Sequence, residues 1–311
     1  MTYNFVTIFN SLYLPQAISL HDSLKKFKLK FNLWAICLDQ ESFETINKFG
    51  IESFKAINFS KFENKKLKSI KKDRSIAEYC WTITPISPKI IFNLKKNIEL
   101  VTYVDADMYF LKNPKFLINN FIKSKKKILF TRHDFNDDQM FKEKNYGKFC
   151  VQFMTFKKNG SELIRKIWEK KCIEWCFAEP SRGRMGDQKY LDNIYLKFKE
   201  KIYISDDDCF RSTWNYERIK FNKIIAWHFH GLRVQKNRIL CFLRYKIPYP
   251  VIEKIYDPCI HEIRKIVKDL TIEISQGKIE SQFIRILRRF DSYICTFGKK
   301  FSNDTNEIGE Q

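Results

Sequence analysis

The order of segments in the first 50 residues constrains the fold of this chain more than any other feature of its sequence. Residues 4–9 and 31–38 are apolar runs rich in β-branched and aromatic side chains, the pattern of buried strands. Residues 14–27 and 40–49 have helical spacing, and Gly50 follows the second segment. This alternating order with short connections predicts an α/β fold, with a mixed, mostly parallel central sheet flanked by helices.

The later elements continue this pattern and then change in character. Further strands are expected at residues 127–131, 150–156, 201–205 and 223–229, with a long helix over 161–177. After His230 the segments become basic and amphipathic, which predicts a C-terminal helical appendage.

The composition of the 311 residues is that of a globular protein, with 44% hydrophobic and 16% aromatic side chains. The net charge of +21 favours anionic partners, although frequent Lys, Asn, Ile and Phe also fit an A/T-rich codon bias. The start lacks the pattern of a signal peptide, and no window approaches the roughly 20 apolar residues of a membrane span. Nine scattered cysteines fit reduced thiols, so we expect a cytoplasmic protein.

Two carboxylates, Asp105 and Asp107, stand in the stretch "YVDADMYFL" directly after an apolar strand. If the strand continues through them, both side chains point the same way; if it ends at Val104, a turn can aim both at the crevice beyond the strand. An isolated D-x-D triplet is more commonly a turn or a helix cap. In this apolar setting, however, two acids are costly to bury without a cation, and carboxylates favour Mg²⁺ or Mn²⁺.

Several blocks of the chain, in order, resemble bacterial glycosyltransferases related to glycosyltransferase family 8. The blocks are "TIFNSLYL", "RSIAEYCWTITP", "VTYVDADMYFLKNP", "CIEWCFAEPSRGRMGDQKYLD" and "WHFHGLR", within residues 7–233. The resemblance implies the nucleotide-diphospho-sugar transferase fold called GT-A. It also implies a GT-A catalytic domain over residues 1–235, followed by a basic C-terminal helical extension over 236–311.

By this resemblance, Asp105 and Asp107 are metal-binding aspartates, with Asp105 nearer the nucleotide ribose and Asp107 on the ion. The block "HFHG" matches a family pattern in which the first histidine is the third ligand, which implies His228. His230 is the alternative, because a continuing strand would point both rings the same way. We expect His230 rather than His228 to be the one that packs in the core.

The same resemblance assigns Thr7, Asn10 and Tyr13, at the end of the first strand, to the base and ribose of the nucleotide. Equally, Thr7 could be only a strand residue and Tyr13 only an anchor at the start of a helix.

Two arginines are expected to contact the nucleotide sugar, because a guanidinium pairs well with phosphate. Arg74 could reach a phosphate or the sugar, although Lys71 or Lys72 could serve instead. The family's Lys-Pro-Trp is absent after the histidine, so Arg233 or Lys236 is expected at the diphosphate.

"GDQKYLD" resembles the motif that family members place beside the transferred sugar. It implies that Asp187 binds sugar hydroxyls and that Gln188 lies near the anomeric carbon; these are the expected catalytic residues. Ordinary helix capping by Asp187 is the alternative. Where relatives usually read "FNVGF", this chain has "FCVQF", with Cys150 and Gln152. The resemblance therefore leaves the choice of donor or acceptor open, and a weakly active member of the family is an alternative.

The resemblance implies a metal-dependent transfer of a sugar from a nucleotide diphosphate sugar to a hydroxyl acceptor, with retention of configuration. The expected cofactor is Mn²⁺ or Mg²⁺. The expected acceptor is a glycan or lipid-linked precursor of a surface polysaccharide, with an anionic membrane surface as a possible partner. The alternatives are a metal-dependent phosphohydrolase or nuclease and a basic nucleic-acid-binding protein, but no nucleic-acid module is recognisable and a nuclease normally clusters more acids.

Overall fold

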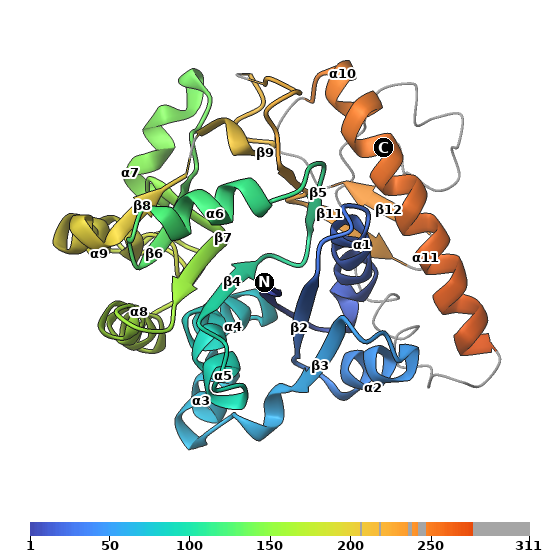
Figure 1. Ribbon diagram of the computed structural model, residues 1–311, viewed down its shortest axis with the longest axis horizontal. Coiled ribbons are helices and arrows are strands. Elements are labelled where there is room, and N and C mark those ends of the chain that lie inside the picture. The colour runs from blue at the N-terminus through green and yellow to red at the C-terminus, as the bar shows by residue number, and fades with distance from the viewer. Residues whose placement is uncertain (206, 218, 236–237, 242–246, 276–311) are drawn as a thin grey trace.

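The central feature is a seven-stranded sheet with the strand order β3-β2-β1-β4-β7-β6-β8 (Figure 1). The computed structural model describes residues 1–205, 207–217, 219–235, 238–241 and 247–275. The strands are β1 (Tyr3–Phe9), β2 (Phe31–Cys37), β3 (Phe54–Asn58), β4 (Leu100–Val104), β6 (Ile128–Arg132), β7 (Phe149–Lys157) and β8 (Ile202–Ile204). Only β7 runs antiparallel to its neighbours β4 and β6 within this sheet, which confirms the mixed, mostly parallel sheet.

Helices cover both faces of the sheet because its strands alternate between two apolar faces. Val6 and Ile8 of β1 pack in one core cluster, and Phe5 and Phe9 pack in the other. The helices are α1 (Leu14–Lys25), α2 (Gln40–Phe49), α3 (Lys65–Ile70), α4 (Ile76–Ile83), α5 (Ser87–Leu94), α6 (Lys115–Lys123), α7 (Glu143–Tyr146), α8 (Glu162–Glu174), α9 (Tyr190–Phe198), α10 (Tyr249–Val251), a π-helical turn (Ile252–Tyr256) and α11 (Asp257–Ser275). Gly50 ends α2 with a left-handed backbone, φ 60°, as its sequence position indicates.

A second sheet of three strands brings residues 226–228 next to the segment that follows Asp107. Its order is β5-β10-β9, with β5 (Met108–Phe110), β9 (Phe210–Ser212) and β10 (Ala226–His228). The antiparallel register pairs His228 with Met108, one residue beyond Asp107. The hairpin of β11 (Leu232–Gln235) and β12 (Arg238–Cys241) follows.

The long helix α11 lies along α1 (Figure 1). Its apolar side chains, including Cys259, Ile263 and Val267, are buried in a cluster with residues of β10 and β11. Of the two expected C-terminal helices, the segment that contains Phe283, Ile286, Leu287 and Phe290 lies outside the described residues.

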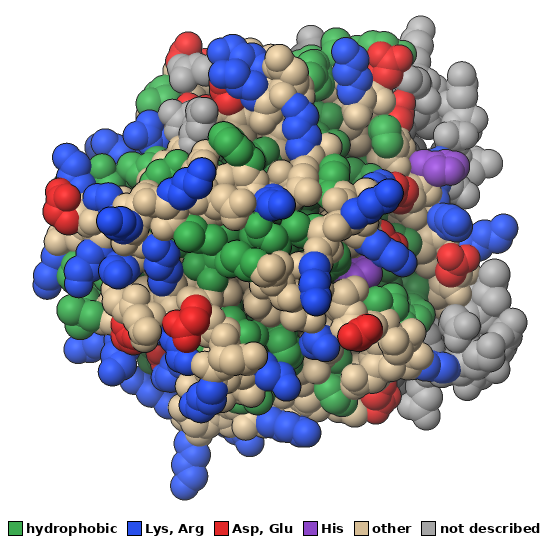
Figure 2. Space-filling view, viewed as in Figure 1, with side chains coloured by type: hydrophobic (Ala, Val, Ile, Leu, Met, Phe, Trp, Pro, Cys, Tyr) green, Lys and Arg blue, Asp and Glu red, His purple; other side chains and the backbone are tan. Residues whose placement is uncertain are grey.

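The basic side chains are spread widely over the face seen in Figure 2, with apolar side chains near its centre. None of the described helices has both the length and the apolar character that a membrane span requires.

Candidate active site

Asp105, Asp107 and His228 lie together at the carboxyl end of β4. The strand ends at Val104, so the turn, rather than a continuing strand, aims the two carboxylates. The His228 Nε2 is 3.1 Å from the Asp107 Oδ1 and 3.8 Å from the Asp105 Oδ2. One ligand atom from each of the three residues lies within 4.8 Å of the others, close enough for all three to bind a single metal ion.

Backbone hydrogen bonds hold the three residues in place. The Asp105 amide donates to the Gln152 carbonyl at 3.1 Å, and the Phe229 amide donates to the Asp107 carbonyl at 2.9 Å. On the other side, the Ser212 hydroxyl donates to the His228 carbonyl at 2.8 Å. These bonds attach Asp105 to β7, Asp107 to the residue after β10 and His228 to β9, so the three side chains are held in place before any ion binds.

The electrostatics of this cluster favour a positive charge between the carboxylates. Burial raises the pKa of Asp105, although His228 acts against it. Burial also acts to raise the pKa of Asp107, but the nearby His228 outweighs it and the pKa falls to about 2. For His228 itself, burial opposes the charge, yet Asp107 holds its pKa well above the usual range.

Two carboxylates and one imidazole suit Mn²⁺ or Mg²⁺ and leave positions for substrate oxygens. Two buried polar atoms of residues next to the cluster, the Gln152 Nε2 and the Asp187 Oδ2, have no hydrogen-bond partner among the described residues, and neither does the Oγ1 of Thr7 in β1. Buried polar groups are normally paired, so these atoms indicate a place for a polar ligand. The donor set and these unpaired atoms both fit a divalent cation with a hydroxyl- and phosphate-bearing ligand.

The end of β1 contributes the residues expected to hold the nucleotide. Thr7 is fully buried in the strand, and Asn10 is buried just before the short 3₁₀ helix Ser11–Tyr13. The Arg233 guanidinium lies 4.8 Å from the centre of the Tyr13 ring. Arg233 is also close enough to Asp107 to lower the pKa of that carboxyl. The structure thus brings Tyr13 and Arg233 to the metal cluster, and their contacts with a nucleotide remain predictions.

Asp187 lies in the turn before α9 and is 4% exposed. Burial, followed by the negative charge of Asp105, raises its pKa well above the usual range. Helix α9 starts at Tyr190, with Lys189 before it, so helix capping by Asp187 is wrong. The Gln188 amide nitrogen contacts the Met185 sulfur at 3.4 Å.

Arg74 is engaged by the protein itself. Its guanidinium donates to the Thr82 hydroxyl and to the carbonyls of Cys172 and Ile173, at 2.9 and 3.0 Å for the carbonyls. These bonds tie α4 to the end of α8, which gives Arg74 a structural role. Its contact with a nucleotide sugar remains a prediction, as does that of Lys71, which pairs with Glu63 at 3.0 Å.

The expectation that His230 packs in the core is wrong. His230 is exposed, while His228 is buried. The alternation of a strand does not extend to His230 because β10 ends at His228, and Gly231 follows with φ 87°.

No protein-family model matches the chain. It is similar to two proteins of Bacillus subtilis (strain 168): uncharacterized protein YfnF, 26% identical over 75% of this chain and 83% of that protein, and uncharacterized protein YfnD, 24% identical over 86% and 91%.

Solved glycosyltransferases share its architecture. The galactosyltransferase LgtC, in complex with donor and acceptor sugar analogues, aligns with a TM-score of 0.54 at 10% identity, over 91% of this chain and 99% of that one. The glycosyltransferase GlyE of Streptococcus pneumoniae TIGR4 aligns with a TM-score of 0.54 at 12% identity, over 90% of this chain and 64% of that one. Mouse xyloside xylosyltransferase 1 aligns with a TM-score of 0.50 at 15% identity, over 74% of this chain and 98% of that one. The chain has the GT-A fold.

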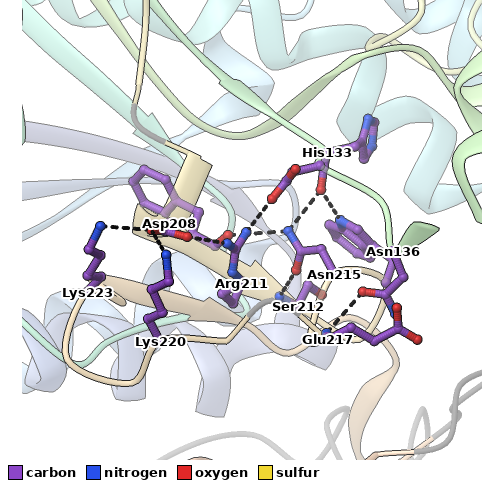
Figure 3. Close-up of polar contacts among 12 residues, drawn as sticks. His133, Asn136, Asp208, Arg211, Ser212, Asn215, Glu217, Lys220 and Lys223 are labelled. Atoms are coloured by element: carbon purple, nitrogen blue, oxygen red, sulfur yellow. Dashed lines mark hydrogen bonds and ion pairs between the residues drawn. The ribbon is translucent and has the colours of Figure 1, made fainter.

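In this GT-A chain, a network of aromatic and polar side chains supports His228. The Trp214 ring packs edge-on against His228, with ring centres 5.3 Å apart, and against His230 at 5.6 Å. The Trp214 indole N–H and the Asn215 amide both donate to the His133 carbonyl, at 3.0 and 2.9 Å (Figure 3). The segment after β9 is thereby joined to the segment after β6.

At the base of this network, the buried Arg211 pairs with Asp134 at 2.7 Å and with Asp208 at 2.8 Å. Lys220 and Lys223 approach Asp208 from the other side (Figure 3). From the sequence, "STWNYE" keeps the Trp-Asn pair that the family resemblance implies, Trp214 and Asn215, but the loop between residues 131 and 150 is only rich in Asp and Asn and gives no signal for the pairing with Arg211.

Proposed function

We propose that this chain is a metal-dependent glycosyltransferase that moves a sugar from a nucleotide diphosphate sugar to a hydroxyl acceptor. The observation that carries the proposal is the convergence of Asp105, Asp107 and His228 at the carboxyl edge of the sheet. In open α/β sheets this edge is where ligands bind. The GT-A fold of the chain supports the same reading.

The roles of the residues follow from their places around the cluster. Asp105, Asp107 and His228 would hold Mn²⁺ or Mg²⁺, and a bound divalent ion stabilises negative charge on a departing diphosphate. Thr7, Asn10 and Tyr13 line the end of β1 and bind the base and ribose in this proposal. Arg233 supplies a second positive charge for the diphosphate.

Asp187 and Gln188 are assigned to the transferred sugar. The Asp187 carboxyl has an unpaired oxygen in a buried position, which a sugar hydroxyl can satisfy. We propose that the sugar keeps its anomeric configuration and that the departing phosphate oxygen takes the acceptor proton. The anomer formed first, followed by NMR during donor hydrolysis, tests retention; an inverted first product would contradict it.

The metal site and the donor class are tested together by thermal unfolding with a panel of nucleotides and nucleotide sugars. We expect at least one nucleoside diphosphate to raise the midpoint only when Mn²⁺ is present, since a ligand that binds the folded state stabilises it. Asp107→Asn should abolish this shift, whereas Asp73→Asn, at an exposed position, should retain it. Absence of any Mn²⁺-dependent shift across the panel would refute the proposal.

We also propose a cytoplasmic site of action on a glycan or lipid-linked acceptor, with residues 276–311 drawing the protein to an anionic membrane surface. Each basic residue near such a surface contributes about 1 kcal/mol, and residues 285–289 include three arginines. A chain without residues 276–311 should float less with anionic vesicles than the full chain. Equal flotation would contradict membrane attachment, and retention on a polyanion column that vanishes at modest salt would indicate charge attraction alone.

A further inference from the structure

Gln152 contacts two of the three residues proposed to bind the metal, His228 and Asp105. It lies in the middle of β7 and is completely buried. Its side-chain Oε1 is 3.1 Å from the Nδ1 of His228, and its backbone carbonyl accepts the amide of Asp105 at 3.1 Å. One residue therefore contacts the imidazole ligand and the first carboxylate ligand at once.

The contacts of His228 determine which way the Gln152 amide faces. The Nε2 of His228 points at the carboxylates, 3.1 Å from Asp107 and 3.8 Å from Asp105. A metal ion bound to that nitrogen uses its lone pair, so the single hydrogen of the neutral ring is on Nδ1. The Nδ1–H donates, so the side chain of Gln152 must present its oxygen to the ring.

In this orientation, the Nε2 of Gln152 must find an acceptor other than the His228 ring. If the amide were turned around, its N–H₂ group would face the Nδ1–H of the ring, and two donors cannot form a hydrogen bond. The Nε2 is buried, and among the described residues it has no hydrogen-bond partner. A buried, unpaired N–H₂ group is costly, and a ligand oxygen would satisfy it.

We propose that Gln152 has two functions: it positions His228 for the metal, and it donates its Nε2 hydrogen to an oxygen of the nucleotide sugar. The inference rests on the proposed function, because it requires a metal and a donor at this site. The acceptor atom is either a phosphate oxygen or a sugar hydroxyl, since both accept this hydrogen bond. In the second case Gln152 contributes to the choice of sugar.

Two substitutions separate the two functions. Gln152→Glu keeps an oxygen for the Nδ1–H of His228 and removes the amide donor. Gln152→Met has a similar length and removes both. Thr155→Val is the matched control, because it deletes a buried side-chain hydrogen bond on the same strand, to Thr102 at 3.0 Å, away from His228. Thermal unfolding without metal establishes that each variant is folded.

The positioning function is measured by titrating each protein with Mn²⁺ and detecting unbound Mn²⁺ by electron paramagnetic resonance. Loss of a residue that orients a metal-bound histidine typically weakens metal binding by about 10–100-fold. We expect a loss of this size in Gln152→Met, and affinities at least equal to wild type in Gln152→Glu and Thr155→Val. Unchanged Mn²⁺ affinity in Gln152→Met would overturn the positioning function while leaving the proposed activity intact.

The donor function is measured by calorimetry with saturating Mn²⁺, using a nucleoside diphosphate that stabilises the wild type and its sugar ester. Loss of one hydrogen bond should weaken binding by about 2–10-fold both to Gln152→Glu and to the uncharged Gln152→Met, whose weaker metal binding is offset by the saturating Mn²⁺. A loss for both ligands assigns the bond to a phosphate oxygen, and a loss for the sugar ester alone assigns it to the sugar. Wild-type affinities for both ligands would overturn the donor function. Absence of Mn²⁺ uptake by the wild type would instead overturn the proposed function and this inference together.

Discussion

His133, in the segment after β6, is a buried residue whose charge state depends on its surroundings. Its Nδ1 is 2.9 Å from the Gly147 carbonyl, and its ring stacks on Phe135 and meets the edge of Trp214. Burial lowers the pKa of His133 from 6.5 to about 4, although the bond to Gly147 acts against the shift. The folded protein therefore keeps this imidazole neutral at pH values where the unfolded chain protonates it.

This shift predicts a loss of stability in acid. The His133 contribution is fully present above pH 6.5 and is lost as the pH falls from 6.5 toward 4, because the unfolded state binds more protons in that window. Between pH 7 and 5 the loss should be about 2 kcal/mol. His133→Gln removes the titration and keeps a donor for Gly147, so its free energy of unfolding should fall by that much less. The free energy of unfolding is measured by urea at pH 7 and pH 5 for wild type and His133→Gln. Equal decreases between the two pH values in both proteins would contradict the shift.

At the scale of elements, a single arginine links the loops behind the small sheet. Arg211 of β9 is 1% exposed and pairs with Asp134 and Asp208. Its strand also carries Ser212, which holds the His228 carbonyl, and leads to Trp214, which packs on the ring. Through Ser212 and Trp214, the ion pairs of Arg211 are thus connected to His228.

Arg211→Met should destabilise the protein by about 3–5 kcal/mol, because it removes a buried guanidinium that pairs with the carboxylates of Asp134 and Asp208. Where enough protein remains folded, we also expect weaker Mn²⁺ binding, since the support of His228 is loosened. Lys220→Met is the control: Lys220 is 62% exposed and 3.6 Å from the same Asp208 carboxylate, so its loss should cost less than about 1 kcal/mol. Similar losses in the two variants by chemical denaturation would contradict this account.

At the scale of the whole molecule, α11 packs onto the rest of the described chain through a polar contact and an apolar face. Glu262 accepts hydrogen bonds from Lys26, directly after α1, and from Tyr109 of β5, at 3.0 Å for Tyr109. Ile263 is buried in the cluster that includes Trp227. These contacts predict that α11 unfolds together with the sheet.

Ile263→Ala should therefore lower the free energy of unfolding of the whole protein by about 2–5 kcal/mol, because it leaves a cavity between α11 and the sheet. The exposed Lys265→Ala should change it by less than about 0.5 kcal/mol. Circular dichroism and tryptophan fluorescence should give one shared transition in both variants. A separate early transition confined to helical signal would show that α11 is not part of the cooperative unit.

The sequence predicted the strands of the large sheet well where they are long and apolar. Residues 4–9, 31–38, 127–131 and 150–156 correspond closely to β1, β2, β6 and β7, because a strand buried on both faces reads as a continuous apolar run. The short strands β5 and β9 were missed, since three residues are too few for a periodic pattern. The expected helix over 161–177 ends at Glu174, where Trp175 adopts an extended backbone.

The sequence by itself determined the α/β class and the pair Asp105 and Asp107 beside a strand, because both follow from local order along the chain. Only the tertiary structure decided that β4 ends at Val104 and that the antiparallel pairing of β10 with β5 brings His228, rather than His230, to those carboxylates. It also decided that Gln152 bonds to the ring of that histidine. These contacts join residues far apart in sequence, and their geometry depends on strand register and packing, which no local pattern encodes.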